Sequence, residues 1–149
     1  MYPSPSIASA FNRRVAELVH YFLGVALEAA SRYLVGAVAL VAAGDYAGAI
    51  SRCYYAAYQA MWAALGEPVT KRRWEHAGII QAFVRGRWDD PSYPMTGPGL
   101  YEPLRLHLRR LYGLRLGVDY RIEPITRETA EWALKVTQDL IATIRVKVR

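Results

Sequence analysis

The stretch AGDYAGAISRCYYAAYQAMWAAL, residues 43–65, decides the fold of this 149-residue chain. Gly44 and Asp45 are expected to end one helix and cap the next, because an Asp side chain accepts from the free N–H groups of a first turn. A helix that starts at Tyr46 has an aromatic face and, opposite it, a face of small residues. Such a helix belongs in the middle of a bundle. Its aromatic face comprises Ala47, Ile50, Tyr54, Ala57, Tyr58, Met61 and Leu65, and its one polar line comprises Arg52, Tyr55 and Gln59.

The remaining apolar residues recur at helical spacing on both sides of this stretch. In no segment do apolar and polar residues alternate for long enough to indicate a strand. The class is therefore all-α, an antiparallel up-and-down bundle of four to five helices in a single domain over residues 1–149, with a flexible tail over residues 1–9. We expect helices over about residues 11–41 (one long helix or two in series), 46–65, 70–85, 100–116 with Gly117 as C-cap, and from a Thr126 cap to the C-terminus.

Composition indicates a globular chain: 53% of the residues are hydrophobic and 21% are charged, which excludes intrinsic disorder. The lone Cys53 lies in the central helix, where we expect a small buried residue rather than a reactive thiol. The N-terminus lacks the pattern of a signal peptide, and the apolar run 34–43 is about half the roughly 20 residues that a bilayer requires. We therefore expect a cytoplasmic protein that has no membrane partner.

The net charge of +6 comes entirely from the second half of the chain, because residues 1–70 carry four basic and four acidic side chains. Sixteen of the 19 basic residues are Arg, whose planar guanidinium matches phosphate bidentately. This balance favours a polyanionic partner such as RNA or a nucleotide. Solvated helix faces in an Arg-rich protein are the alternative explanation.

Arg115 lies within the apolar stripe of the fourth expected helix. With Leu104 at zero on a helical wheel, Arg115 falls within about 40° of it and His107 about 60° away. A guanidinium in that position requires a partner, which Asp119 or the hydroxyl of Tyr120 can supply. These residues are candidates either for a structural ion pair or for a phosphate subsite.

Three segments occur together in this order: GDYAGAISRCYYAAYQAMWAAL (44–65), EHAGIIQAF (75–83) and LYGLRLGVDY (111–120). In this combination the chain resembles, over roughly residues 30–145, the small single-domain members of the HEPN domain family. The resemblance implies a helical bundle that dimerises, with its functional groups in a cleft along the two-fold axis. It also implies a minimal nucleotidyltransferase as partner, the two proteins acting as toxin and antitoxin. In some such proteins the partner nucleotidylates a tyrosine near the arginine, which makes Tyr120 a candidate by proximity.

Many HEPN proteins cleave RNA without a metal ion, by a motif of Arg, four to six residues, and then His. An imidazole can move protons near neutral pH, and a guanidinium can stabilise charge that develops on the phosphate. Arg115 matches the arginine of that motif, but Tyr120 stands five places on and no His follows it. His76 could reach the cleft through space, or it could be a satisfied core group, and the same two interpretations apply to His107.

Two functions remain open from the sequence. The first is a homodimeric module that binds a nucleotide or RNA phosphate and pairs with a nucleotidyltransferase. The alternative is a metal-independent ribonuclease toxin with a degenerate Arg/His motif, so the sequence leaves open whether the protein is an enzyme. No metal site and no cofactor are predicted. The candidate binding residues are Arg115, Asp119, Tyr120, Arg52 and His107, and the candidate catalytic residues are Arg115, His76 and Tyr120.

Overall fold

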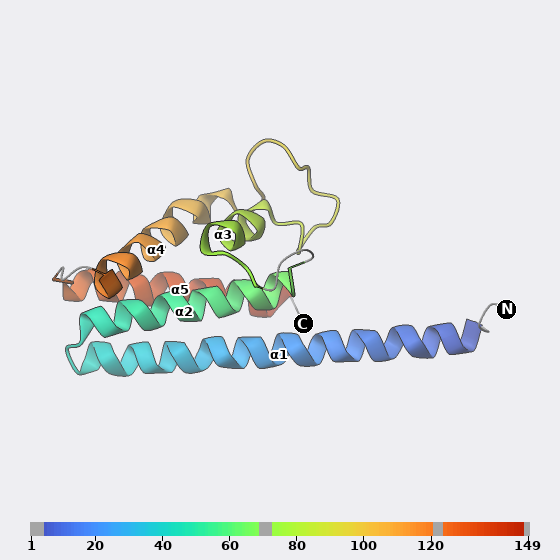
Figure 1. The fold of residues 1–149 in the computed structure, drawn as a ribbon, viewed down its shortest axis with the longest axis horizontal. Coiled ribbons are helices and arrows are strands. Elements are labelled where there is room, and N and C mark those ends of the chain that lie inside the picture. Colours follow the sequence, from blue (N-terminus) through green and yellow to red (C-terminus); the bar gives the residue numbers. More distant parts are fainter. Residues whose placement is uncertain (1–4, 69–72, 121–123, 148–149) are drawn as a thin grey trace.

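The computed structural model of this chain describes residues 5–68, 73–120 and 124–147. These residues contain no strand, which confirms the all-α prediction. Figure 1 shows α1, α2, α4 and α5 running alternately in opposite directions, with the short α3 on the side of α4. The elements are α1 (Pro5–Ala42), α2 (Tyr46–Leu65), α3 (His76–Arg85), the 3₁₀ helix η1 (Glu102–Leu104), α4 (Arg105–Tyr120) and α5 (Arg127–Lys147).

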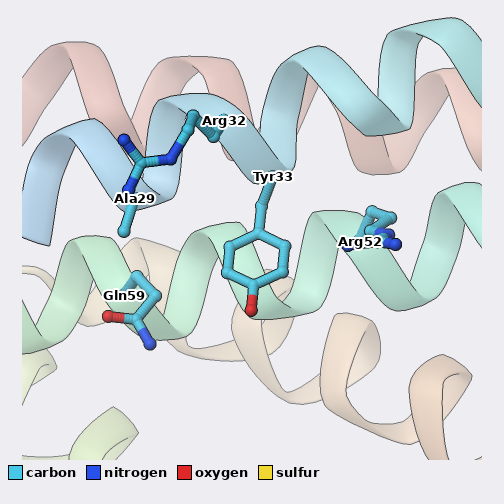
Figure 2. Close-up of a pocket in the computed structure, with 5 residues that line it drawn as sticks. All are labelled: Ala29, Arg32, Tyr33, Arg52 and Gln59. Atoms are coloured by element: carbon cyan, nitrogen blue, oxygen red, sulfur yellow. The ribbon is translucent and has the colours of Figure 1, made fainter.

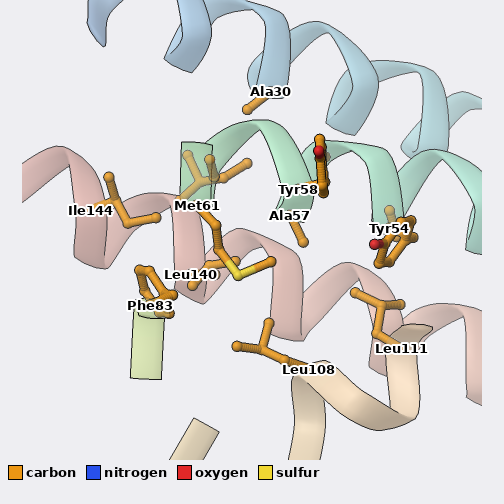
Figure 3. Packing of buried hydrophobic residues seen from close by; sticks show 14 of the residues in the cluster. Ala30, Tyr54, Ala57, Tyr58, Met61, Phe83, Leu108, Leu111, Leu140 and Ile144 are labelled. Atoms are coloured by element: carbon orange, nitrogen blue, oxygen red, sulfur yellow. The ribbon is translucent and has the colours of Figure 1, made fainter. Parts of the chain in front are cut away.

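Helix α2 is the central element, as predicted, because it contacts α1, α3, α4 and α5. Its start is the predicted cap: Asp45 Oδ1 accepts from the backbone N of Gly48 at 2.9 Å. Figure 3 shows the side chains of Met61, Phe83 and Leu140 pointing toward one another in the core beneath it. The buried residues of α2 are Ala49, Ile50, Cys53, Tyr54, Ala56, Ala57, Tyr58, Ala60, Met61 and Ala63.

Helix α1 is one helix of 38 residues, so the two-helix alternative is excluded. It begins at Pro5, and residues 5–9 are therefore helical where the sequence predicts a flexible tail; residues 1–4 lie outside the described residues. Proline suits a first helical turn, because its missing N–H has no helical partner there and its φ is already helical. The N-terminal part of α1 extends beyond the bundle (Figure 1) and exposes Val15 and Leu18.

A 20-residue stretch of α1, Leu23–Ala42, has a mean hydropathy of 1.6 and is long and apolar enough to cross a membrane by length and composition alone. The sequence prediction considered only residues 34–43, because Glu28 and Arg32 interrupt the longer run. The same stretch supplies Leu27 to the core and packs along α2, but only 17% of it is buried. The absence of a membrane partner and the cytoplasmic location stay predictions.

Helix α3 begins at His76, later than the predicted start near Thr70; residues 69–72 lie outside the described residues. Residues 73–75, just before α3, are not helical. Two hydrogen bonds fix Trp74 there, one to α2 and one to the residue that follows α2. Tyr58 donates to the carbonyl of Trp74 at 2.5 Å, and the Trp74 indole donates to the carbonyl of Gly66 at 2.8 Å.

Helix α4 corrects two predicted boundaries. It begins at Arg105, so Leu100 lies in the preceding loop, where it is 38% exposed. Gly117 is a buried residue inside α4 rather than its C-cap, and the helix continues to Tyr120. The ion pair between Arg115 and Asp119 spans one turn across Gly117, which favours continued helix there.

Helix α5 has the predicted cap, because Thr126 Oγ1 accepts from the backbone N of Thr129 at 3.2 Å. Its buried residues are Ala130, Ala133, Thr137, Leu140, Ile141 and Ile144, whereas Leu134 and Val136 are only partly covered. Thr137 tolerates burial because its hydroxyl donates to the carbonyl of Ala133 at 2.8 Å.

Candidate functional site

Arg115 projects from α4 into the bundle and is only 9% exposed, as the helical wheel predicted. Its Nη2 donates to the hydroxyl of Tyr55 on α2 at 2.8 Å. Its Nε lies 2.8 Å from Asp119 Oδ2, one turn further along α4. The structural ion pair that the sequence suggested is therefore present, and its carboxylate is 27% exposed at the edge of the site.

The guanidinium of Arg115 is not fully satisfied by these contacts. Nε is buried and has no hydrogen-bond partner in the described part of the chain, because Asp119 is close but not aligned with the N–H. Burial lowers the pKa of Arg115, but the Tyr55 hydrogen bond and the Asp119 charge outweigh burial, so the pKa is raised. Arg115 is thus a permanent cation with donor capacity left over.

Tyrosine rings surround this cation. The Cζ atom of Arg115 lies 5.4 Å from the ring centre of Tyr54 and 5.3 Å from that of Tyr55, both within cation–π range. Burial raises the pKa of Tyr54, and the nearby Arg115 lowers it only in part, so this hydroxyl keeps its proton. We call Tyr54, Tyr55, Tyr58, His76, Tyr112 and Arg115 the tyrosine cluster.

His76 belongs to the tyrosine cluster, so it does approach the surroundings of Arg115 through space. Its Nδ1 shares a hydrogen bond with the hydroxyl of Tyr54, and its ring stacks on Tyr112 with centres 5.2 Å apart. The ring of Tyr54 contacts both groups, lying 5.3 Å from the imidazole of His76. The sequence separation hid this, since α3 and α4 meet only in the folded chain.

The pKa of His76 is lowered, first by burial and then by the charges of Arg115 and Arg73. The imidazole is therefore neutral at neutral pH. The hydroxyl of Tyr54 and Nδ1 of His76 share one hydrogen bond, whose donor depends on the imidazole tautomer. Tyr54 therefore occupies one ring nitrogen of His76, and Nε2 is the ring nitrogen that it leaves.

The other predicted site residues lie at different distances from this cluster. Tyr120 ends α4 and is 74% exposed, and its phenol is near enough to affect the pKa of Arg115. His107 is exposed and lies against Trp132 of α5, with ring centres 5.9 Å apart, so it has no contact with the cluster. Arg52 lies over the ring of Tyr33 at 5.7 Å, on the side of α2 that faces α1.

The tyrosines of the cluster were not among the predicted site residues, although their spacing in the sequence indicated which of them share a helix face. Tyr54 and Tyr58 are spaced i, i+4 on α2, and Tyr112 precedes Arg115 by three residues on α4, so each pair shares a helix face. Such spacing shows which residues share a face of one helix, but it does not show which helix faces pack against each other. Among the described residues, no three His, Cys, Asp or Glu side chains are grouped so that they could hold a metal ion.

Comparison with known proteins identifies the family. The family model described as HEPN domain matches residues 25–147, a range that contains the whole tyrosine cluster. No curated protein and no solved structure matches the chain. The family match covers most of the chain and agrees with the segments that carry the resemblance in the sequence. The chain therefore belongs to the HEPN domain family.

Proposed function

We propose that this protein is a homodimeric HEPN module that binds a phosphate of a nucleotide or RNA at Arg115. Its proposed partner is a minimal nucleotidyltransferase, in a pair of the toxin–antitoxin type. Membership of the family supports a nucleotide- or RNA-related module. The observation that carries the proposal is the buried guanidinium of Arg115, whose Nε–H makes no hydrogen bond among the described residues although Nε lies 2.8 Å from the carboxylate of Asp119.

A phosphate oxygen would be received on the side of Arg115 where Asp119 now lies. That carboxylate is partly exposed and can turn to solvent, which frees Nε for an anion. Guanidinium and phosphate then pair bidentately, a stronger contact than a neutral hydrogen bond. The exposed ring of Tyr120 offers a surface on which a base can stack.

The state of His76 favours binding over catalysis. A general base must have a free basic nitrogen, and a general acid must carry a transferable proton near neutral pH. The lowered pKa of His76 leaves little imidazolium at neutral pH, so the condition for a general acid is not met at rest, and Tyr54 already engages one of its two ring nitrogens. Nε2 can still form a hydrogen bond with a phosphate or ribose group.

We propose that a second copy of the chain packs on the exposed apolar residues of α1. The extended N-terminal part of α1 exposes Val15 (43%) and Leu18 (56%), and an isolated helix of about 12–15 residues is marginal in water. Next to it, where α1 meets the end of α2, is a largely apolar groove of about 660 Å³. Association of two chains would cover these surfaces. Residues that line the groove include Leu23, Val25, Ala26, Trp62 and Ala63.

The proposal is tested by binding of fluorescein-labelled single-stranded RNA, followed by anisotropy, to wild type and Arg115→Ala. We expect at least a tenfold loss, since a hydrogen bond to a charged group contributes about 1.5–3 kcal/mol. Arg109→Ala is the matched control, because Arg109 is exposed on the same helix. Unchanged affinity of a folded Arg115→Ala protein would refute the proposed site.

One observation favours the alternative, a metal-independent ribonuclease: Tyr54 contacts both His76 and Arg115. Incubation of labelled RNA with the protein in EDTA tests it. Cleavage that disappears in both His76→Ala and Arg115→Ala would establish the ribonuclease. Intact RNA with retained binding is the result that our proposal predicts.

A further inference from the structure

An open pocket of about 370 Å³ lies between α1 and α2, beside the tyrosine cluster but outside it. Figure 2 shows Tyr33 reaching from α1 across α2, with Gln59 on one side of its ring and Arg52 on the other. Arg32 comes from α1 and lies on the Gln59 side. The lining residues are Ala29, Arg32, Tyr33, Arg52 and Gln59.

The two arginines of this pocket carry charge that no carboxylate balances. Both are exposed, and in the described ranges neither forms an ion pair. Glu28, four residues before Arg32 on α1, is at the right spacing to pair with it but does not. Two of the four basic residues in the first 70 thus line one pocket, on either side of the Tyr33 ring. Such a site attracts an anion.

The pocket is connected to Arg115 through two tyrosines whose rings are tilted by 30° to each other. The ring of Tyr33 lies 5.9 Å from the ring of Tyr55, and the hydroxyl of Tyr55 accepts the hydrogen bond from Arg115. Arg52 lies over the other side of this path, 5.7 Å from the centre of the Tyr33 ring. Two tyrosine rings therefore lie between the exposed Arg52 of the pocket and the buried guanidinium of Arg115.

We infer that this pocket is a second phosphate subsite, so that the ligand of the protein is a single RNA strand rather than a mononucleotide. This inference rests on the proposed function, in which Arg115 holds another phosphate of the same strand. Arginine side chains contact the phosphates, and a base stacks on Tyr33. A positively charged groove with aromatic side chains on which bases stack is the usual design of surfaces that bind single strands.

The test compares an RNA octamer with UMP for wild type and for the double variant Arg32→Ala/Arg52→Ala. The control Arg13→Ala/Arg109→Ala removes the same charge from exposed side chains elsewhere. We expect the pocket variant to bind the octamer at least tenfold more weakly and UMP within about twofold of wild type. The salt dependence should fall too, because each phosphate contact on a single strand contributes about 0.7 to the slope.

Equal loss in the control, or octamer binding by the pocket variant at the wild-type level, would overturn this inference. So would a parallel loss of UMP and octamer, because the pocket would then belong to the mononucleotide site. Arg115→Ala separates the two proposals. If it binds UMP as wild type does, the proposed function fails, whereas the pocket result is judged on the octamer alone.

Discussion

Replacement of Asp119 by Asn separates the two roles of Arg115, as a structural cation and as a receiver of phosphate. The carboxylate lies 2.8 Å from Nε of a guanidinium that is almost fully buried. The substitution keeps the shape of the side chain and removes the charge. The guanidinium then keeps its hydrogen bond to the neutral hydroxyl of Tyr55 but loses its charged partner.

The loss of stability follows from the burial of the two partners. Removal of one partner of a fully buried ion pair costs about 3–5 kcal/mol, because the other charge stays unpaired. Asp119 is 27% exposed, so water already screens the pair and can solvate the freed guanidinium in part. We therefore expect about 1–3 kcal/mol. For a chain of this size, each kcal/mol lowers the melting temperature by about 2–4 °C.

Ligand affinity should change in the opposite direction. A bound phosphate would lie close to the carboxylate, and two like charges about 6 Å apart repel by about 0.7 kcal/mol even at the dielectric constant of water, about 80. Asp119→Asn should thus bind RNA at least about threefold more tightly while it unfolds more easily. Urea unfolding followed by far-UV circular dichroism and RNA anisotropy measure the two effects. A variant that loses stability and also loses RNA affinity would show that Asp119 does not compete with the ligand.

Three further predictions concern the stability and reactivity of the fold. Gly99→Ala should destabilise the protein by about 2–4 kcal/mol in urea unfolding, because a Cβ there would lie 2.3 Å from the carbonyl oxygen of Val84. Gly97→Ala, at a φ of +78° with open space around it, should cost only about 1 kcal/mol, and equal losses would contradict the packing argument. The lowered pKa of His76 means that the unfolded chain takes up its proton first. Stability should therefore be full above about pH 6.5 and decrease as the pH falls below it. His76→Gln should flatten this dependence between pH 7.5 and 5.5, and an unchanged slope would exclude His76 as its source. Burial raises the pKa of Cys53 to about 11, so a thiol reagent should label it in urea but hardly at all in the folded protein.

The central helix and the position of Arg115 could be predicted because both follow from periodicity within one segment. The cap at Asp45 and the burial of Arg115 need only the 3.6-residue repeat and the chemistry of a first turn. The end of α4 could not be predicted in this way. Glycine is a common C-cap, yet Gly117 lies inside the helix, where the ion pair of Arg115 with Asp119 bridges it.

The composition of the site depended on contacts between helices, which the sequence does not specify. His76 and Arg115 are on different helices, and Tyr54 on a third helix brings their surroundings together. His107 was predicted as a site residue because it lies near the apolar stripe on the helical wheel. In the structure it packs on Trp132, away from the cluster. A helical wheel gives the direction of a side chain, not the neighbour that it meets.

The most direct test of the account is the ¹H–¹⁵N signal of Arg115 Nε–Hε, assigned by its absence in Arg115→Lys and followed during titration with UMP. This N–H is buried and makes no hydrogen bond among the described residues, although its nitrogen lies 2.8 Å from Asp119, and a phosphate would give it an aligned acceptor. The account predicts a saturable shift of this signal at the UMP concentrations that compete with RNA. A signal that stays in place while RNA binds would contradict it.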